Sequence, residues 1–112
     1  MKLDRAAWKP YFEEMTRLLE GRQVYVEAAS LSLGDQVQVE WAPLRGITYD
    51  PKNDLFEVLL DELDHLIRHP KDVHVGYGDS GVEAIEIVDG DDTQQIIRLR
   101  APLELPAPGG TG

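Results

Sequence analysis

The first twenty residues of the chain carry large apolar side chains at helical spacing. These side chains recur every three or four positions, at Trp8, Tyr11, Phe12, Met15, Leu18 and Leu19. Such spacing places them along one side of a helix. Because a lone amphipathic helix needs a surface to bury its apolar side against, we expect this helix to pack on a sheet formed by the rest of the chain.

The limits of this helix are set by residues that favour or oppose helical backbone. Asp4 is a candidate N-cap, and Gly21 is a candidate stop. Proline is unfavourable deep inside a helix and is accepted in its first turn. Because of Pro10 we therefore predict an opening turn over 4–8 and a main helix over 9–20.

From Arg22 onward the apolar residues alternate with polar ones, which is the pattern of strands. The alternating runs are separated by turns rich in glycine, proline and aspartate, one of them a hairpin turn at 33–36. The predicted strands cover 22–29, 36–41 with its continuation at 47–49, 55–60, 73–77, 82–88 and 93–100. Consecutive strands at this spacing are usually antiparallel neighbours.

Pro43 and Gly46 interrupt the second predicted strand, where we expect a bulge or bend at which the strand crosses between two layers. The fold class is α+β: an N-terminal helix followed by a strongly curved antiparallel sheet of five to six strands, closing as an SH3-like or Sm-like barrel. An open sheet with the helix on one face is the alternative. We expect one domain over 1–105, with the helix at about 4–20 and the sheet at about 22–100, and a disordered Pro/Gly-rich tail over 106–112.

The chain is acidic, with a formal net charge of −10. Its first twenty residues carry four bases and four acids, whereas the remaining residues carry seven bases and seventeen acids. Nucleic-acid binding relies on lysine and arginine at phosphates, and an acidic domain repels a polyanion at long range. The charge argues against nucleic acid or membrane as a partner and is compatible with a basic protein. Acidity also keeps a small domain soluble.

The absence of cysteine excludes disulfides, thiolate catalysis and cysteine-ligated zinc. The first residues hold no apolar run of the signal-peptide kind. No apolar run approaches the length of about 20 residues that spans a bilayer. We therefore expect a cytoplasmic protein.

The run from Asp61 to Pro70 concentrates groups that donate, accept and titrate. It holds two of the three histidines, His65 and His69, together with Arg68 and three acids. Histidine is the usual proton carrier in catalysis, but the chain contains no nucleophile-elbow serine, phosphate-binding loop or HExxH motif. We therefore expect neither enzyme activity nor a cofactor, and interpret the run as a binding site.

The leading hypothesis is that the loop 61–70 docks a protein partner. The candidate contact residues are Asp64, His65, Arg68 and His69, and arginine is enriched at interaction hot spots. The partner is unknown, and pairing through an edge strand would give a homo-oligomer. Alternatively, Arg68 pairs with Asp64 at helical i, i+4 spacing and only stabilises a turn.

The runner-up hypothesis is a small metal- or ligand-binding protein that uses His65 and His69. On a helix, Asp61 would share one face with both histidines, and a carboxylate with two imidazoles suits zinc or iron. The segment is short, however, and Pro70 ends it. The histidines could instead hold a loop in place through hydrogen bonds to backbone carbonyls or to Asp64.

Several stretches of the chain resemble a known family. These stretches are Leu3–Arg5, Trp8–Phe12, Gly34–Gln36, Gly46–Pro51, Leu63–Pro70 and Gln95–Arg100. On them, over about residues 3–105, the chain resembles a bacterial family of small proteins known only as a domain of unknown function, and the LDHLIRHP motif is the most specific part. The resemblance implies a bacterial single-domain protein and carries over no activity, cofactor or site residue.

Overall fold

The computed structural model describes residues 1–103 and consists of one helix and eight strands. The neighbouring strands are all antiparallel, in the order β1-β6-β7-β8-β2-β3-β4-β5. The elements in chain order are β1 (Lys2–Leu3), α1 (Arg5–Leu19), β2 (Gln23–Ser30), β3 (Gly34–Asp50), β4 (Leu55–Leu60), β5 (Asp64–Arg68), β6 (Asp72–Gly78), β7 (Gly81–Val88) and β8 (Gln94–Leu103). The expected disordered tail over 106–112 lies outside the described residues.

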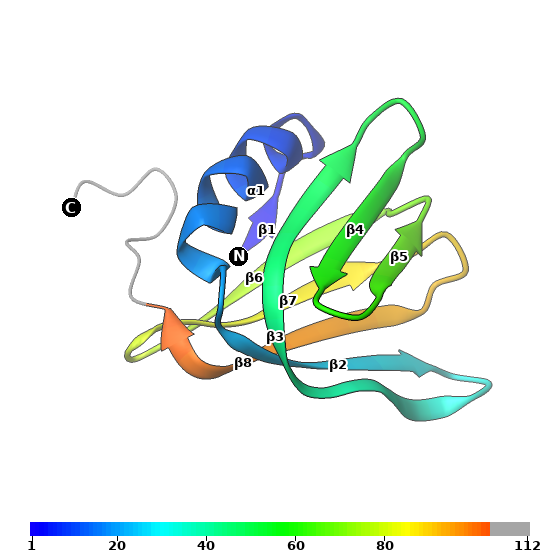
Figure 1. Cartoon of the computed structure of the whole chain (residues 1–112). Coiled ribbons are helices and arrows are strands. Elements are labelled where there is room, and N and C mark those ends of the chain that lie inside the picture. Colours follow the sequence, from blue (N-terminus) through cyan, green and yellow to red (C-terminus); the bar gives the residue numbers. More distant parts are fainter. Residues whose placement is uncertain (104–112) are drawn as a thin grey trace.

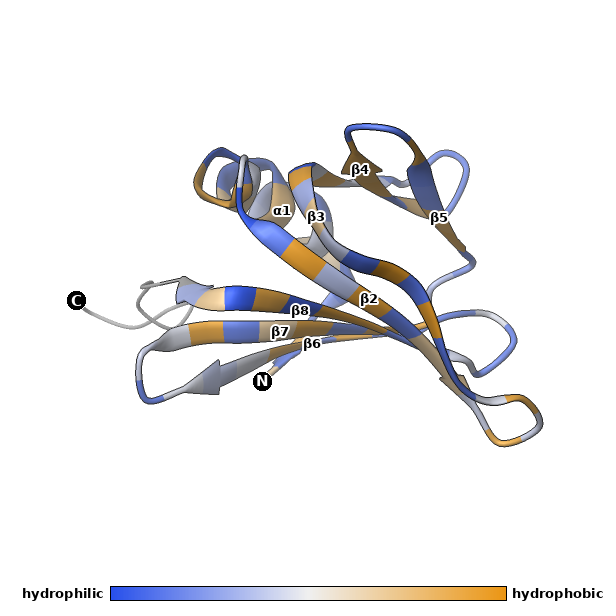
Figure 2. Ribbon diagram, turned by 60° about the horizontal axis from the view of Figure 1, so that its bottom comes forward, coloured by the Kyte–Doolittle hydropathy of each residue, from blue (hydrophilic) through white to orange (hydrophobic). Residues whose placement is uncertain are grey.

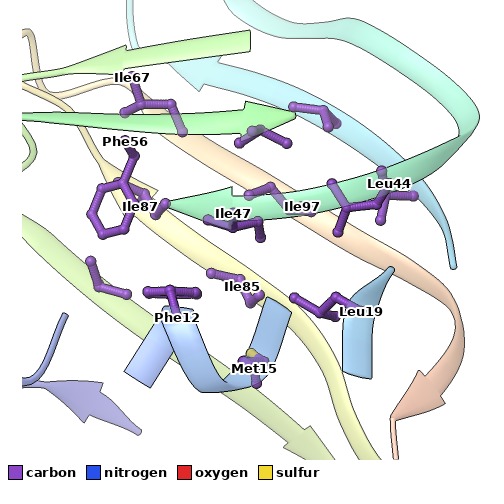
Figure 3. Close-up of a cluster of buried hydrophobic side chains, with 14 of the residues drawn as sticks. Phe12, Met15, Leu19, Leu44, Ile47, Phe56, Ile67, Ile85, Ile87 and Ile97 are labelled. Atoms are coloured by element: carbon purple, nitrogen blue, oxygen red, sulfur yellow. The ribbon is translucent and has the colours of Figure 1, made fainter. Parts of the chain in front are cut away.

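The sheet folds over on itself, so that the molecule has two layers (Figure 1). One layer contains α1, the second half of β3, β4 and β5, and the other contains β6, β7, β8, β2 and the first half of β3, as Figure 2 shows. β1 pairs with β6 and so belongs to the second of these layers. Side chains from both layers meet in one core (Figure 3), whose labelled members are Phe12, Met15, Leu19, Leu44, Ile47, Phe56, Ile67, Ile85, Ile87 and Ile97.

The helix supplies most of the apolar stripe that its sequence predicts, but Leu18 is 46% exposed and Tyr11 is only partly buried. Its buried residues are Trp8, Phe12, Met15 and Leu19, and Trp8 Nε1 also donates a hydrogen bond to the carbonyl of buried Leu3. Asp4 occupies the N-cap position but makes no side-chain capping bond. No helix in the described part of the chain is long and apolar enough to cross a membrane.

The predicted opening turn over 4–8 is wrong, because α1 is already helical from Arg5. Pro10 is the sixth residue of this helix and deprives the carbonyl of Ala6 of its usual i+4 donor. Both Ala6 and Pro10 lie on the exposed side of the helix. Water can therefore satisfy this carbonyl, which lowers the cost of a proline past the first turn.

The bend predicted between Pro43 and Gly46 is confirmed. β3 pairs with β2 as far as Pro43 and with β4 from Leu44 onward, with a register shift between Leu44 and Gly46. A Cβ on Gly46 would lie 2.8 Å from Thr16 Cγ2. Thr16 Oγ1 accepts from the amide of Ile47 (3.1 Å) and donates to its carbonyl (2.9 Å), so α1 covers the edge of β3 at the bend.

The expected SH3-like or Sm-like barrel is wrong, and so is the count of five to six strands. β6 pairs with β1 on one edge and with β7 on the other. Because β5 therefore cannot pair with β6, the sheet stays open. β1 is too short to show an alternating pattern, and β5 lies in the run expected to be a loop or helix. The β2–β3 turn is at 31–33, and Gly34 already opens β3 opposite Ser30.

Two neighbouring residues of β5 allow a direct test of its strand geometry, since Ile67 is 1% exposed and Leu66 is 41% exposed. Ile67→Ala should lower the free energy of unfolding by about 2–5 kcal/mol, because it leaves a cavity in the core. Leu66→Ala should change that free energy by no more than about 0.5 kcal/mol. Urea unfolding of both variants provides the measurement, and similar losses in the two would contradict the orientation of β5.

Candidate functional site

β5 divides the candidate residues between two faces of a strand. His65 and Ile67 turn toward the fold, whereas Asp64, Leu66 and Arg68 are exposed. This alternation is the period of two that a strand imposes. Residues four apart on a strand are separated by about 13 Å, so the Arg68–Asp64 pair considered for a helical turn does not form.

His65 connects β5 to the opposite layer. Its Nε2 lies 2.8 Å from Gln95 Oε1, and Gln95 Nε2 donates to Asp89 Oδ2 at 3.1 Å. The side-chain amide nitrogen of Gln95 donates to the Asp89 carboxylate, so the side-chain oxygen of Gln95 is the atom that faces His65. This oxygen can only accept a hydrogen bond, and His65 Nε2 therefore carries the proton. Asp89 Oδ1 in turn accepts the amides of Asp91 and Thr93. This candidate contact residue thus ties β5 to the β7–β8 turn.

His69 belongs to a group that we call the corner cluster: Arg5, Tyr49, Asp54 and His69. The His69 amide donates to the carbonyl of Asp54 (2.9 Å), and its Nδ1 lies 3.6 Å from Asp54 Oδ2. Tyr49 donates its hydroxyl to Asp54 Oδ1 at 2.7 Å. Arg5 donates to the same oxygen (3.2 Å) and to the carbonyl of Pro70 (2.8 Å). The cluster joins the start of α1, the β3–β4 turn and the end of β5.

The electrostatics of the corner cluster favour an ionised Asp54. The hydrogen bond from Tyr49 lowers the pKa of the Asp54 carboxyl, and Arg5 lowers it further, against the opposing effect of desolvation. Burial raises the pKa of the Tyr49 hydroxyl, and the neighbouring Asp54 carboxylate adds to this shift. The Arg5 guanidinium carbon also lies 4.4 Å from the centre of the Trp8 ring. These contacts bind the members to one another, which suits a structural clamp.

The helical face on which the metal hypothesis rested is absent. Asp61 pairs with Arg45 Nε at 2.8 Å, whereas His65 and His69 have the separate partners described above. Within residues 1–103 no group of three histidine, aspartate or glutamate side chains is placed to hold a metal ion.

The backbone of β5 has one edge paired and one edge free. The His69 amide donates to Asp54 and the Leu60 amide donates to Leu63, so the odd-numbered residues of this segment face β4. The amides and carbonyls of Asp64 and Leu66 therefore point away from β4, and no other residue in 1–103 pairs with them. Farther along the edge, the amide of Gly90 covers the carbonyl of Arg68 at 3.2 Å.

Sequence reasoning missed the corner cluster and Trp41, an exposed residue whose backbone φ is 43°. Arg5 is 44 and 49 positions from its partners Tyr49 and Asp54, so no local pattern links them. The one usable signal for Trp41 was its place beside the interrupted stretch at Pro43, where a bulge was expected. The candidates Asp64 and Arg68 are exposed as a docking site requires, His69 lies at its rim, and His65 faces inward.

Asp54→Asn tests the charge of the corner cluster, because asparagine tolerates the left-handed backbone of Asp54 (φ 50°). At neutral pH the variant should be less stable than the wild type by up to about 1 kcal/mol, the scale of a partly exposed ion pair. The folded-state pKa of Asp54 is lowered, so this stabilisation is complete above the unfolded pKa of about 4 and is lost as the pH falls through the folded value.

The difference in unfolding free energy between wild type and Asp54→Asn should therefore be constant near neutral pH. Below about pH 4 this difference should shrink toward zero. Urea unfolding between about pH 3 and 7 measures it, with Asp79→Asn, an exposed turn residue, as the matched control. A difference that stays unchanged across this range would show that the Asp54 charge contributes nothing.

Comparisons with other proteins place the chain in a family without assigning it a function. An uncharacterized protein of Aquifex aeolicus (strain VF5) is 39% identical over 105 residues, which cover 93% of this chain and 95% of that protein. No solved structure matches the chain. The model of the Family of unknown function (DUF5335) matches residues 1–108. The chain therefore belongs to this family, which the resemblance in its sequence had indicated.

Proposed function

We propose that this protein is a non-enzymatic protein-interaction module and that β5 is its docking edge. The observation that supports this proposal most is the free edge of β5, where the backbone amides and carbonyls of Asp64 and Leu66 have no partner in the described chain. An extended segment of another protein can satisfy such groups by adding a strand to the sheet. Main-chain hydrogen bonds then supply affinity, and alternate side chains supply specificity.

The edge of β5 lacks several of the usual protections against strand addition, although Gly90 covers its last carbonyl, that of Arg68. Proteins guard their edges with proline, lysine, bulges or very short strands. β5 is five residues long, contains neither proline nor lysine, and pairs with β4 without a register shift. The other edge strand, β1, is only two residues long. An edge with few of these protections is consistent with a surface available for a partner, and over residues 34–43 β3 likewise pairs on one side only, with β2.

The charges at the start of this edge favour a basic group of the partner there. Glu62 and Asp64 lie at the start of β5 and form no ion pair within residues 1–103. Leu63 is 51% exposed and would add apolar contact. We therefore expect an extended segment in which apolar and basic side chains alternate. Complementary charge of this kind raises association rates and suppresses wrong partners.

The fold holds the docking edge rigid at both of its ends. His65 connects β5 to Gln95 in the other layer, and the corner cluster fixes the backbone at His69 and Pro70. A preorganised strand loses little conformational entropy when a partner binds, which strengthens binding without extra contacts. In this account the two histidines serve the site by positioning the strand, while the exposed residues make the contacts.

Leu66→Pro tests the docking edge, because proline removes an amide that the fold does not use and edge strands tolerate it. Co-purification from a bacterial extract should recover a partner with wild type and with Leu66→Ala, and should fail with Leu66→Pro. Thermal melting must first show that the variants fold alike. Loss of the partner with Leu66→Ala as well would place the contact in the side chain rather than the backbone edge.

Asp64→Lys gives a second test that leaves the backbone intact. It places a lysine, a common edge protector, at the position where we expect a basic segment to dock. The variant should lose the partner while melting like the wild type. A partner that is retained by both Leu66→Pro and Asp64→Lys, or no partner recovered with any form, would contradict the proposal.

A further inference from the structure

A groove opens beside the start of β5, between the bend of β3 and the turn that joins β4 to β5. Its volume is about 310 Å³, and it is lined by Val39, Trp41, Ala42, Pro43, Leu60, Asp61, Glu62 and Leu63. One side is thus built from β3 and the other from the end of β4 and the turn 61–63. Because this turn leads directly into Asp64, a segment that docks on β5 passes close to the groove.

Trp41 reaches this groove because of an irregularity in the sheet. Val24 pairs with Ala42 and Val26 pairs with Val39, so two residues of β3, Glu40 and Trp41, oppose one residue of β2. Trp41 also has a φ of 43°, which is uncommon for a bulky side chain. Bulges of this kind redirect a side chain and occur often at functional sites, and strained backbone is retained there for the same reason.

The Trp41 ring is supported by neighbours that lie outside the groove. Tyr25 is 5.4 Å from it, centre to centre, and the Arg100 guanidinium carbon lies 5.5 Å from its centre. Trp41 also lines a second hollow, which it shares with Glu83 and Arg100 and with none of the other groove residues. An aromatic ring that is 38% exposed and held in this way offers a fixed platform to a ligand.

We infer that this groove is a pocket for one lysine or arginine side chain of the segment that docks on β5. The inference rests on the proposed function and names the feature of the partner that the site would recognise. Val39, Pro43 and Leu60 provide apolar walls for the aliphatic stem. Trp41 and Glu62, which line the same groove, supply an aromatic residue and a carboxylate that can bind the cationic end.

The chain itself shows that this rim accepts a guanidinium group. Arg45 Nε already pairs with Asp61 Oδ1 at 2.8 Å, while Glu62 has no ion-pair partner within residues 1–103. A second cation brought by a partner can therefore pair with Glu62 in the groove that Trp41 also lines. An apolar side chain would leave both of these features unused, which is the basis of the expected selectivity.

N-acetyl-arginine amide and N-acetyl-norleucine amide are defined probes for the pocket that do not depend on the β5 edge. Titration followed by NMR should shift the Trp41 indole signal with the arginine amide and leave it nearly unchanged with the norleucine amide. Trp41→Gly, which suits the positive φ, and Glu62→Gln should each weaken binding about two- to fivefold. Glu83→Gln, in the second hollow, is the matched control and should have no effect.

Equal shifts with the two amides would mean that the pocket recognises apolar groups only. Binding of the arginine amide that is unaffected by Glu62→Gln would mean that the carboxylate does not contribute. Either result overturns the inference. The same probes separate this inference from the proposed function. Leu66→Pro should leave arginine amide binding intact while abolishing capture of a partner. A partner that is lost with Leu66→Pro and kept with both Trp41→Gly and Glu62→Gln would support the docking edge and refute the pocket.

Discussion

The close contact between Thr16 of α1 and the bend of β3 is the constraint on which the two-layer arrangement depends. Only a residue without a Cβ leaves room for Thr16 at Gly46, where that atom would lie 2.8 Å away, and the Thr16 hydroxyl satisfies both backbone groups of Ile47. This contact joins the helix to the sheet where β3 leaves one layer for the other (Figure 1). β4 and β5 are thereby carried into the layer of the helix, above the core.

The same bend carries the β5 edge of the sheet into the layer of the helix. Beyond it, β3 has α1 on one side and β4 on the other, and β6 has its two edges taken by β1 and β7. Within residues 1–103, β5 has one unpaired edge, and the strand is held in place by His65 and by the corner cluster of Arg5, Tyr49, Asp54 and His69. Rigid support of an exposed strand, an acidic start at Glu62 and a groove beside it together describe a surface suited to an extended basic segment.

The elements that sequence reasoning identified are those with a long periodic pattern, such as the apolar stripe of α1 and the alternating runs of most strands. The bend was also found, because proline and glycine mark it directly. β5 was missed because five residues are too few to distinguish a period of two from helical spacing, and His65 and His69 fit both. The corner cluster and the orientation of Trp41 depend on tertiary contacts and on one positive φ, neither of which leaves a local signal.

Amide hydrogen exchange along β5 tests the central claim most directly, because it reports which backbone groups are paired. We expect the amides of His65 and Ile67, which face β4, to exchange slowly, and those of Asp64 and Leu66, which face the free edge, to exchange fast. An alternating pattern of this kind would establish β5 as an ordered strand with one free edge. Uniform fast exchange would show that the segment is not a stable strand, and protection of Asp64 and Leu66 in the isolated chain would show that the edge is already covered.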